Sequence, residues 1–356
     1  MRHESPDTTR RNSIGALRVL LAVLVLYSHA HFLGGFPAEW FYFWSAQRLI
    51  LGSVAVQCFF VLSGWLVVTS WRRRPAVGRF LWHRLLRLAP AFWVCLAFTA
   101  FVLTPLLWLT TPDAKPLVDL LPAAAGYIWH NLFLPRSQIS VGPFPNGGPW
   151  GVDWNGSLWT LFYEGTCYLL VVALGLVGLL GRGRVAGTAL IGALLAGNFI
   201  WPGTQPFYNT PGKLLMLHFF AGGVWAMWPA QAEAALGRPW LASLAAVVLV
   251  ASWHESARGL LSPLLVPPAL LWLCQNGPLQ NFEQWAGGDY SYGLYIYGYP
   301  IQQTLTHFQF QRFGFGPFLT VGLALTLALA VASWRLIERR ALMLKGASWP
   351  RLLNFG

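Results

Sequence analysis

Charged side chains are scarce in this chain of 356 residues. Only 10% of the residues are Asp, Glu, Lys or Arg, whereas a soluble domain carries about 25%. Hydrophobic residues make up 56%, and a soluble chain of this size has no core large enough to bury so much apolar surface. The shortage of charge therefore excludes an ordinary soluble fold and predicts that lipid surrounds most of the chain.

Acidic residues are the scarcer charged class, with 12 against 24 Lys and Arg residues and a formal net charge of +12. Such a balance can indicate nucleic-acid binding. Here the basic residues flank apolar runs, which is typical of membrane topology, so we expect no nucleic-acid partner. The chain also has 20 Trp, 24 Phe and 11 Tyr residues, and aromatic rings collect at membrane–water interfaces.

Cysteine is also rare, and its spacing excludes two common uses. The four cysteines fall within apolar runs and none stands in a CxxC pair, so the sequence predicts neither a disulfide framework nor a metal site. We interpret them as small buried apolar residues. They are Cys58, Cys95, Cys167 and Cys274.

Apolar runs recur along the chain and predict an all-α, polytopic membrane bundle of about ten transmembrane helices. We expect a basic cytoplasmic tail over 1–13, one transmembrane domain over 14–340 and a second cytoplasmic tail over 341–356. The tail at 1–13 has no signal-peptide cleavage pattern after it. The predicted spans are 14–33, 47–70, 86–109, 159–181, 185–200, 213–229, 240–253, 260–274, 291–307 and 317–337.

The basic residues divide unevenly between the two sides of this predicted bundle. With ten spans and the N-terminus inside, 18 of the 24 Lys and Arg residues lie on the inner side. Since cytoplasmic loops carry the excess of Lys and Arg, we expect both termini in the cytoplasm. The longest loop, about 110–158, then lies outside, and within it 117–135 is expected to form a short helix at the outer surface. Loops of this length are usually functional or disordered.

Arg18 and His29 lie on one face of the first predicted span. Their separation along the sequence amounts to roughly 1100° of helix rotation, three turns plus about 20°, and an axial distance of about 16 Å. Arg18 would lie at the cytoplasmic mouth, where a cation suits an anionic ligand, and His29 midway across, where an imidazole suits proton transfer. The structural alternatives are a snorkelling arginine and a histidine hydrogen-bonded between helices.

A second pair of arginines opens the third predicted span. Arg84 and Arg87 are three residues apart and so share a helix face, on the same side of the membrane as Arg18. Paired guanidinium groups bind phosphates well, but basic residues here can also serve only to set topology. We interpret Arg72–Arg74 as a topology signal alone, and Ser63 with the adjacent glycine as a close contact between helices.

Glu164 is the only acidic residue that we place well inside a span. It enters the membrane from the outer side, within the segment Asn155–Glu164. A lone carboxylate at this depth is either protonated or paired, and His29 or an arginine would be its partner. Ionisable residues within membranes mark functional sites by default.

The ninth predicted span carries a tyrosine face. Tyr292, Tyr295 and Tyr299 follow one another at helical spacing within SYGLYIYGYP. These side chains could line a polar cavity, or they could be interface tyrosines of the kind that flank membrane spans.

Together and in this order, these segments resemble the acyltransferase 3 family of bacterial membrane O-acyltransferases, over about residues 14–340. The family's patterns are an Arg and a His separated by ten residues, an FFVLSGFL-like segment, an Arg-x-x-Arg pair before a proline, an LWTLPYE-like segment, an SYGLYLYHFP-like segment and a closing Glu. The matching positions are Arg18 and His29, Phe59–Leu66, Arg84 with Arg87 and Pro90, Leu158–Glu164, Ser291–Pro300, and Glu338.

The sequence departs from the family pattern at three positions. Trp65 stands where Phe is common, Gly165 where many members have a second Glu, and Gly298 where many have His. A two-carboxylate site and a second imidazole are therefore not expected. We also expect no C-terminal hydrolase-like domain.

The resemblance implies an enzyme with acyl-CoA, usually acetyl-CoA, as co-substrate and no bound cofactor or metal. The acceptor would be a carbohydrate hydroxyl, as in an exopolysaccharide, O-antigen or capsule. The location would be the bacterial inner membrane, with the lipid bilayer and polysaccharide-assembly proteins as further partners.

The resemblance and the placement of charges together suggest roles for the candidate residues. His29 would act as general base or as an acylated intermediate, and Glu164 would orient His29 or bind the sugar. Arg18, Arg84 and Arg87 would hold the phosphates of CoA. The residues expected to bind the acceptor or line the cavity are Ser63, Trp159, Tyr292 and Tyr295.

Three other functions fit the composition. A transporter or flippase for a lipid-linked glycan would line its path with these polar groups, although the sequence has no evident symmetric halves. A structural subunit of a polysaccharide machine would explain neither the shared face of Arg18 and His29 nor Glu164. An acyltransferase could instead act on a macrolide, lipid or peptide.

Overall fold

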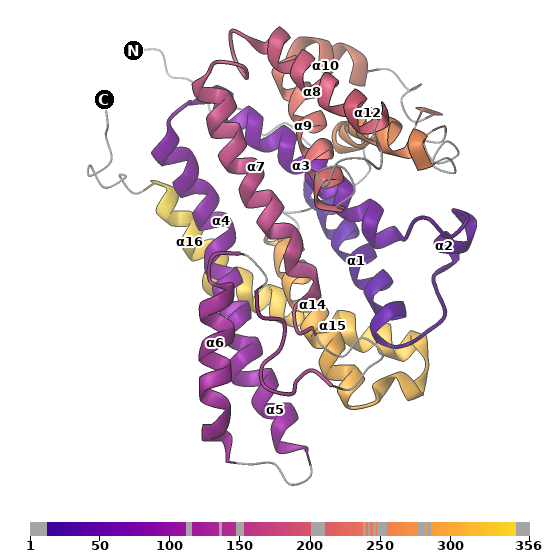
Figure 1. Cartoon of the computed structure of the whole chain (residues 1–356), viewed down its shortest axis with the longest axis vertical. Helices are drawn as coiled ribbons and strands as arrows, with labels where there is room; N and C mark the ends of the chain where they lie inside the picture. Colours follow the sequence, from indigo (N-terminus) through magenta and orange to yellow (C-terminus); the bar gives the residue numbers. More distant parts are fainter. Residues whose placement is uncertain are drawn as a thin grey trace.

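The computed structural model (Figure 1) describes most of the chain, with gaps. The described residues are 13–111, 116–134, 137–146, 153–200, 211–237, 240, 243–244, 247, 255–276, 282 and 286–346.

Helices dominate this part of the chain, and no β-strand forms among the described residues, which confirms the predicted all-α fold class. The α-helices are α1 (Ile14–Leu33), α2 (Trp40–Trp44), α3 (Leu51–Arg73), α4 (Val77–Phe98), α5 (Thr104–Leu109), α6 (Leu121–Asn131), α7 (Trp159–Leu176), α8 (Arg184–Ile200), α9 (Pro211–Met227), α10 (Pro229–Leu236), α12 (Glu255–Asn276), α14 (Ser291–His307), α15 (Phe315–Ser333) and α16 (Arg339–Met343).

Five helical segments of the described chain are long and apolar enough to cross a membrane. Two shorter apolar helices lie at Arg184–Gly197 and Gly212–Met227. The predicted count of ten spans stays a prediction, and most of the predicted span 240–253 lies outside the described residues. The five segments are Ile14–Leu33, Leu51–Arg73, Val77–Leu109, Gly156–Leu176 and Phe315–Gly346.

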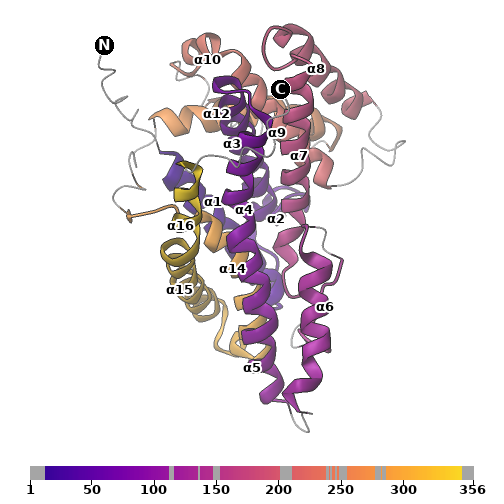
Figure 2. The same cartoon turned by 90° about the vertical axis from the view of Figure 1, so that its left-hand side faces the viewer.

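Helices α5 and α6 lie at one end of the molecule, and α8, α10 and α12 lie at the other, in both views (Figures 1 and 2). A π-helical turn, Thr99–Leu103, joins α4 to α5 without a break, so the two read as one long helix. The helix expected within 117–135 is present as a 3₁₀ turn followed by α6.

Helix α3 packs backbone to backbone against α9. A Cβ at Gly64 would clash with the carbonyl oxygen of Phe219, and one at Gly222 with the carbonyl oxygen of Val61. Small residues permit this close approach in membrane helices, where van der Waals packing takes over the role of the hydrophobic effect. The close helix contact that we predict at Ser63 and Gly64 is therefore confirmed for Gly64.

The segment before α7 folds into the bundle and fixes where that helix begins. The side chain of Trp154 is fully buried. The amide of Asn155 donates to Thr99 Oγ1 at 3.2 Å and to the hydroxyl of Tyr127 at 2.5 Å. Two residues further on, Ser157 Oγ donates to the carbonyl oxygen of Tyr295 at 3.3 Å. These bonds attach the start of α7 to α4, α6 and α14 and so position Glu164.

Candidate active site

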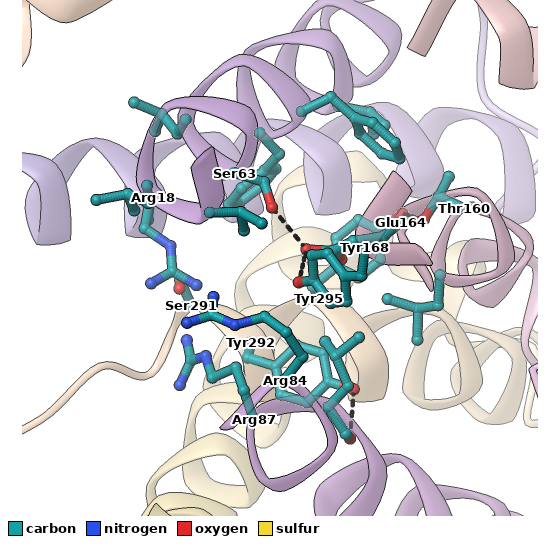
Figure 3. Close-up of a pocket in the computed structure, with 18 of the residues that line it drawn as sticks. Arg18, Ser63, Arg84, Arg87, Thr160, Glu164, Tyr168, Ser291, Tyr292 and Tyr295 are labelled. Carbon is teal, nitrogen blue, oxygen red and sulfur yellow. Dashed lines mark hydrogen bonds between the residues drawn. The ribbon is translucent and has the colours of Figure 1, made fainter. Parts of the chain in front are cut away.

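A cavity of about 350 Å³ lies between α1, α3, α4, α7 and α14, and we call it the central cavity. Figure 3 shows its labelled lining residues, with Arg18, Arg84 and Arg87 on one side and Ser63, Glu164 and Tyr168 on the other. Lys345 also lines it. The cavity thus has a cationic end and an end that carries a carboxylate and hydroxyl groups.

Asp289 holds two of the arginines at the cationic end. Arg18 Nη1 lies 2.6 Å and Arg87 Nη2 lies 2.5 Å from the same oxygen, Asp289 Oδ2. Burial alone raises the pKa of the Asp289 carboxyl, but the two guanidinium groups hold that pKa well below its usual range. Arg87 also lies 3.7 Å from Glu338 Oε2. The two arginines are therefore fixed in place by carboxylates.

Asp289 was not predicted as a site residue, although its sequence context carries a signal. It stands just before α14, and its Oδ1 accepts from the backbone N–H of Ser291 at 3.2 Å and from the Ser291 hydroxyl at 2.5 Å. An Asp side chain that accepts from the backbone N–H two residues on forms an Asx turn. This turn uses one carboxylate oxygen and leaves the other available to the arginines, whose distance along the sequence hid the pairing.

Arg84 differs from the other two arginines because it has no carboxylate partner among the described residues. The Nε atom of Arg84 is buried and has no hydrogen-bond partner among the residues that the structure describes. The guanidinium carbon lies 5.7 Å from the ring centroid of Phe80 and 5.8 Å from that of Tyr168. Such a cation, held between two rings and not neutralised, attracts an anionic ligand.

Glu164 makes its hydrogen bonds within the other end of the cavity. Ser63 Oγ donates to Glu164 Oε1 at 2.9 Å, and the hydroxyl of Tyr168 donates to the same oxygen at 2.6 Å. The expected pairing with His29 or an arginine is not seen among the described residues. Tyr168 was missed in the sequence, although it lies one helical turn after Glu164, which is the spacing for contact on a helix face.

The three tyrosines on one face of α14 are buried, so they are not interface tyrosines that face lipid. Tyr292 and Tyr295 line the central cavity. The hydroxyl of Tyr292 donates to the carbonyl oxygen of Leu88 at 2.9 Å. The hydroxyl of Tyr295 lies 2.6 Å from Thr160 Oγ1 and donates to the carbonyl oxygen of Ser157 at 3.0 Å. Tyr299, one turn further along, lies beyond the cavity.

His29 is not among the residues that line the central cavity. Its ring meets that of Tyr299 edge to face, with 5.0 Å between the centroids. Tyr299 follows the cavity-lining Tyr295 by one helical turn, so this contact places His29 next to the residue one turn after Tyr295 on α14. Trp159 does not line the cavity either, and its ring packs against Tyr163 at 5.7 Å between centroids.

A buried carboxylate that the sequence did not reveal fixes the helix around His29. Ser28 Oγ donates to Glu39 Oε2 at 2.7 Å, and the backbone N–H of Gly52 donates to Ser28 Oγ at 2.7 Å. Glu39 also accepts from the backbone N–H of Leu51 at the start of α3. A carboxylate is favourable at a helix N-terminus, and here it joins α3 to the turn of α1 that carries His29.

The fold and this cavity define a polytopic membrane protein with an internal site that has a cationic end. The sequence model of an acyltransferase domain, that of the acyltransferase 3 family, matches residues 11–335. The chain therefore belongs to the acyltransferase 3 family. It is a membrane-bound acyltransferase, which decides between the enzyme and transporter interpretations of the sequence.

Two relatives match nearly their whole length. An O-acetyl transferase of Shigella phage Sf6 is 27% identical, with 94% of this chain and 96% of the relative covered. Nodulation protein 10 of Rhizobium leguminosarum bv. viciae is also 27% identical, with 97% of this chain and 96% of the relative covered. No solved structure gives a significant match to the chain.

Proposed function

We propose that this protein is an O-acyltransferase of the bacterial inner membrane. In this proposal it moves an acyl group, acetyl in the first instance, from acyl-CoA to a hydroxyl of an extracytoplasmic or lipid-linked carbohydrate. The observation that carries the proposal is the central cavity, which joins a cluster of cations to Ser63, Glu164 and Tyr168. The likeness to a phage O-acetyl transferase supports the choice of hydroxyl acceptor and acetyl group.

The cationic end of the cavity suits the phosphates of CoA. Guanidinium groups bind phosphate oxygens through paired hydrogen bonds, and Arg84 has no competing carboxylate among the described residues. Arg18 and Arg87 present fixed positive charge, because Asp289 holds both. If the excess of basic residues marks the cytoplasm, this end opens to the cytoplasm, where acyl-CoA is found.

The pantetheine arm would then run along the cavity and bring the thioester toward His29. In the transfer step, the acceptor oxygen forms a bond to the acyl carbon and the carbon–sulfur bond breaks. His29 takes the hydroxyl proton and returns it to the leaving thiolate, so CoA departs as a thiol. In the alternative route His29 is acylated first and then passes the acyl group to the acceptor.

Glu164 is placed to hold one wall of the cavity. With Ser63 and Tyr168 as its donors, it serves in this proposal to fix the path of the arm or to bind the acceptor hydroxyl. It would act through these contacts and not through a hydrogen bond to His29, because its side-chain bonds among the described residues go to Ser63 and Tyr168.

The test is CoA release from acetyl-CoA by the purified protein, with a panel of glycan acceptors and detection of the acylated glycan by mass. We expect release in the wild type and its loss in His29→Ala. His31→Ala is the matched control, because His31 bonds the carbonyl oxygen of Pro37 and lies outside the cavity. Normal turnover in His29→Ala would overturn the assigned role.

A further inference from the structure

A second and larger cavity opens at the end of the bundle where α3 ends and α4 begins. Its volume is about 740 Å³, and we call it the mouth cavity. Residues from the end of α12 and the start of α1 close its other side. The side chains that matter for its chemistry are Trp65, Arg73, Arg74, Arg79, Phe80 and His83.

The mouth cavity is strongly cationic. Three arginines line it, no acidic residue does, and within the described chain none of the three forms an ion pair. Arg72, beside them, has a different role, because its Nη1 donates to the carbonyl oxygen of Ala226 and so attaches α3 to α9. The interpretation of Arg72–Arg74 as a topology signal alone therefore leaves Arg73 and Arg74 unexplained, since both face a cavity.

Two aromatic side chains, Trp65 and Phe80, line the same cavity as the arginines. Flat aromatic rings stack on the planar faces of nucleobases, and this stacking does not depend on the base. A ring next to guanidinium groups is thus suited to a ligand that has both a base and a phosphate. A topology signal requires only the charge and would need neither the rings nor the cavity.

The mouth cavity adjoins the central cavity. Leu66 lines both, and Phe80 of the mouth cavity lies 5.7 Å from the guanidinium carbon of Arg84, which lines the central cavity. The central cavity, at about 350 Å³, is near the low end of the range for small-ligand sites, about 300–1,000 Å³. An acyl-CoA, with its nucleotide, its diphosphate and its arm, needs more room than this.

We propose that the mouth cavity binds the adenosine 3′-phosphate end of acyl-CoA. Arg73, Arg74 and Arg79 would contact the 3′-phosphate, and Trp65 would stack on the adenine. The diphosphate would pass Leu66 to reach Arg84, and the narrow arm would fill the central cavity. This inference rests on acyl-CoA as the donor, and it adds a nucleotide site whose three arginines lie outside the motif segments matched to the family.

The kinetic test compares three donors on the full-length protein in zwitterionic nanodiscs: acetyl-CoA, acetyl-dephospho-CoA, which lacks the 3′-phosphate, and S-acetyl-pantetheine, which lacks the nucleotide. We expect the double variant Arg74→Gln/Arg79→Gln to raise KM for acetyl-CoA about tenfold, as for the loss of charge-assisted phosphate contacts. KM for S-acetyl-pantetheine should be unchanged. Arg340→Gln, an exposed arginine on α16 outside both cavities, should match the wild type with every donor.

Two kinetic results would overturn the inference. One is an equal loss of activity with all three donors in the double variant, which would indicate a structural role for the arginines. The other is an unchanged KM for acetyl-CoA. Trp65→Leu gives a separate check, because it removes the ring and keeps the charge: it should raise KM for acetyl-CoA and leave that for S-acetyl-pantetheine unchanged.

Binding of adenosine 3′,5′-bisphosphate, measured by calorimetry, separates this inference from the proposed function. If the wild type binds this probe and the double variant does not, the mouth cavity is a nucleotide site even if no acceptor supports turnover. Turnover with acetyl-CoA but no affinity for the probe would refute the site and leave the proposed function intact.

The headgroup phosphate of an anionic lipid shares the chemistry of the 3′-phosphate. Repeating the binding measurement with phosphatidylglycerol in the nanodiscs distinguishes the two sources. We expect the probe to bind with little change in Kd. Complete loss of probe binding in the anionic nanodiscs, in the wild type, would show that the arginines serve lipid and would overturn the assignment.

Discussion

Replacing Asp289 by Asn tests how the cationic end of the central cavity is held together. Asn keeps the side-chain oxygen that accepts from the backbone N–H of Ser291 but removes the charge that Arg18 and Arg87 share. The Asp289 side chain is only 8% exposed, and those of the arginines are 21% and 15% exposed. Removing one partner of a buried ion pair costs about 3–5 kcal/mol, because it leaves uncompensated charge.

We expect Asp289→Asn to lower the thermal unfolding midpoint in detergent by about 5–10 °C. Asp119→Asn, which removes an exposed carboxylate on the 3₁₀ turn before α6, should change stability by no more than about 0.5 kcal/mol. Adding CoA should restore more of the midpoint in Asp289→Asn than it adds to the wild type, because phosphate replaces the missing negative charge. A midpoint equal to that of the wild type would refute the account of this cluster.

Three further outcomes follow from the packing and the charges. Gly64→Val should lower the free energy of unfolding by about 3 kcal/mol or more, because the valine side chain meets the backbone of α9 at Phe219. Ser63→Ala in the same assay should lower it by no more than about 1.5 kcal/mol. Equal unfolding midpoints for the two variants would contradict the helix contact. Glu164→Gln should lower kcat about tenfold or more while leaving CoA binding intact, since the amide oxygen can still accept from both hydroxyls but lacks the negative charge of the carboxylate. An unchanged kcat would remove Glu164 from the site. The pKa of Asp289 is held below its usual range, so the carboxylate stabilises the fold above about pH 4 and loses this effect as the pH falls further. The thermal midpoint of the wild type should therefore fall more steeply below about pH 4 than that of Asp289→Asn.

Much of the cavity could be predicted from the sequence, because helical spacing places residues on faces. Arg84 and Arg87 do share a face, and both line the central cavity with Arg18, Ser63 and Glu164. The spacing of Tyr292 and Tyr295 also holds in the structure. These predictions depend only on the geometry of single helices.

The partners of these residues could not be predicted, because they depend on how helices pack. Asp289 lies 271 positions from Arg18 and 202 from Arg87, and no periodicity in the sequence relates them. The pairing of Glu164 with Ser63 arises from the way in which Asn155 and Ser157 hold the start of α7. Nothing in the sequence around Glu39 indicates that it is buried. His29 shares a face of α1 with Arg18 but does not line the central cavity.

Direct binding of CoA to the purified protein tests the central claim, that the cationic end of this cavity holds the acyl donor. Arg84→Met is the most informative variant, because Arg84 has no carboxylate partner among the described residues, so its loss leaves no acid unpaired. We predict that CoA binds the wild type, that its affinity falls with added salt, and that Arg84→Met weakens it at least about tenfold. No affinity for CoA in the wild type, or an equal affinity in Arg84→Met, would contradict the account.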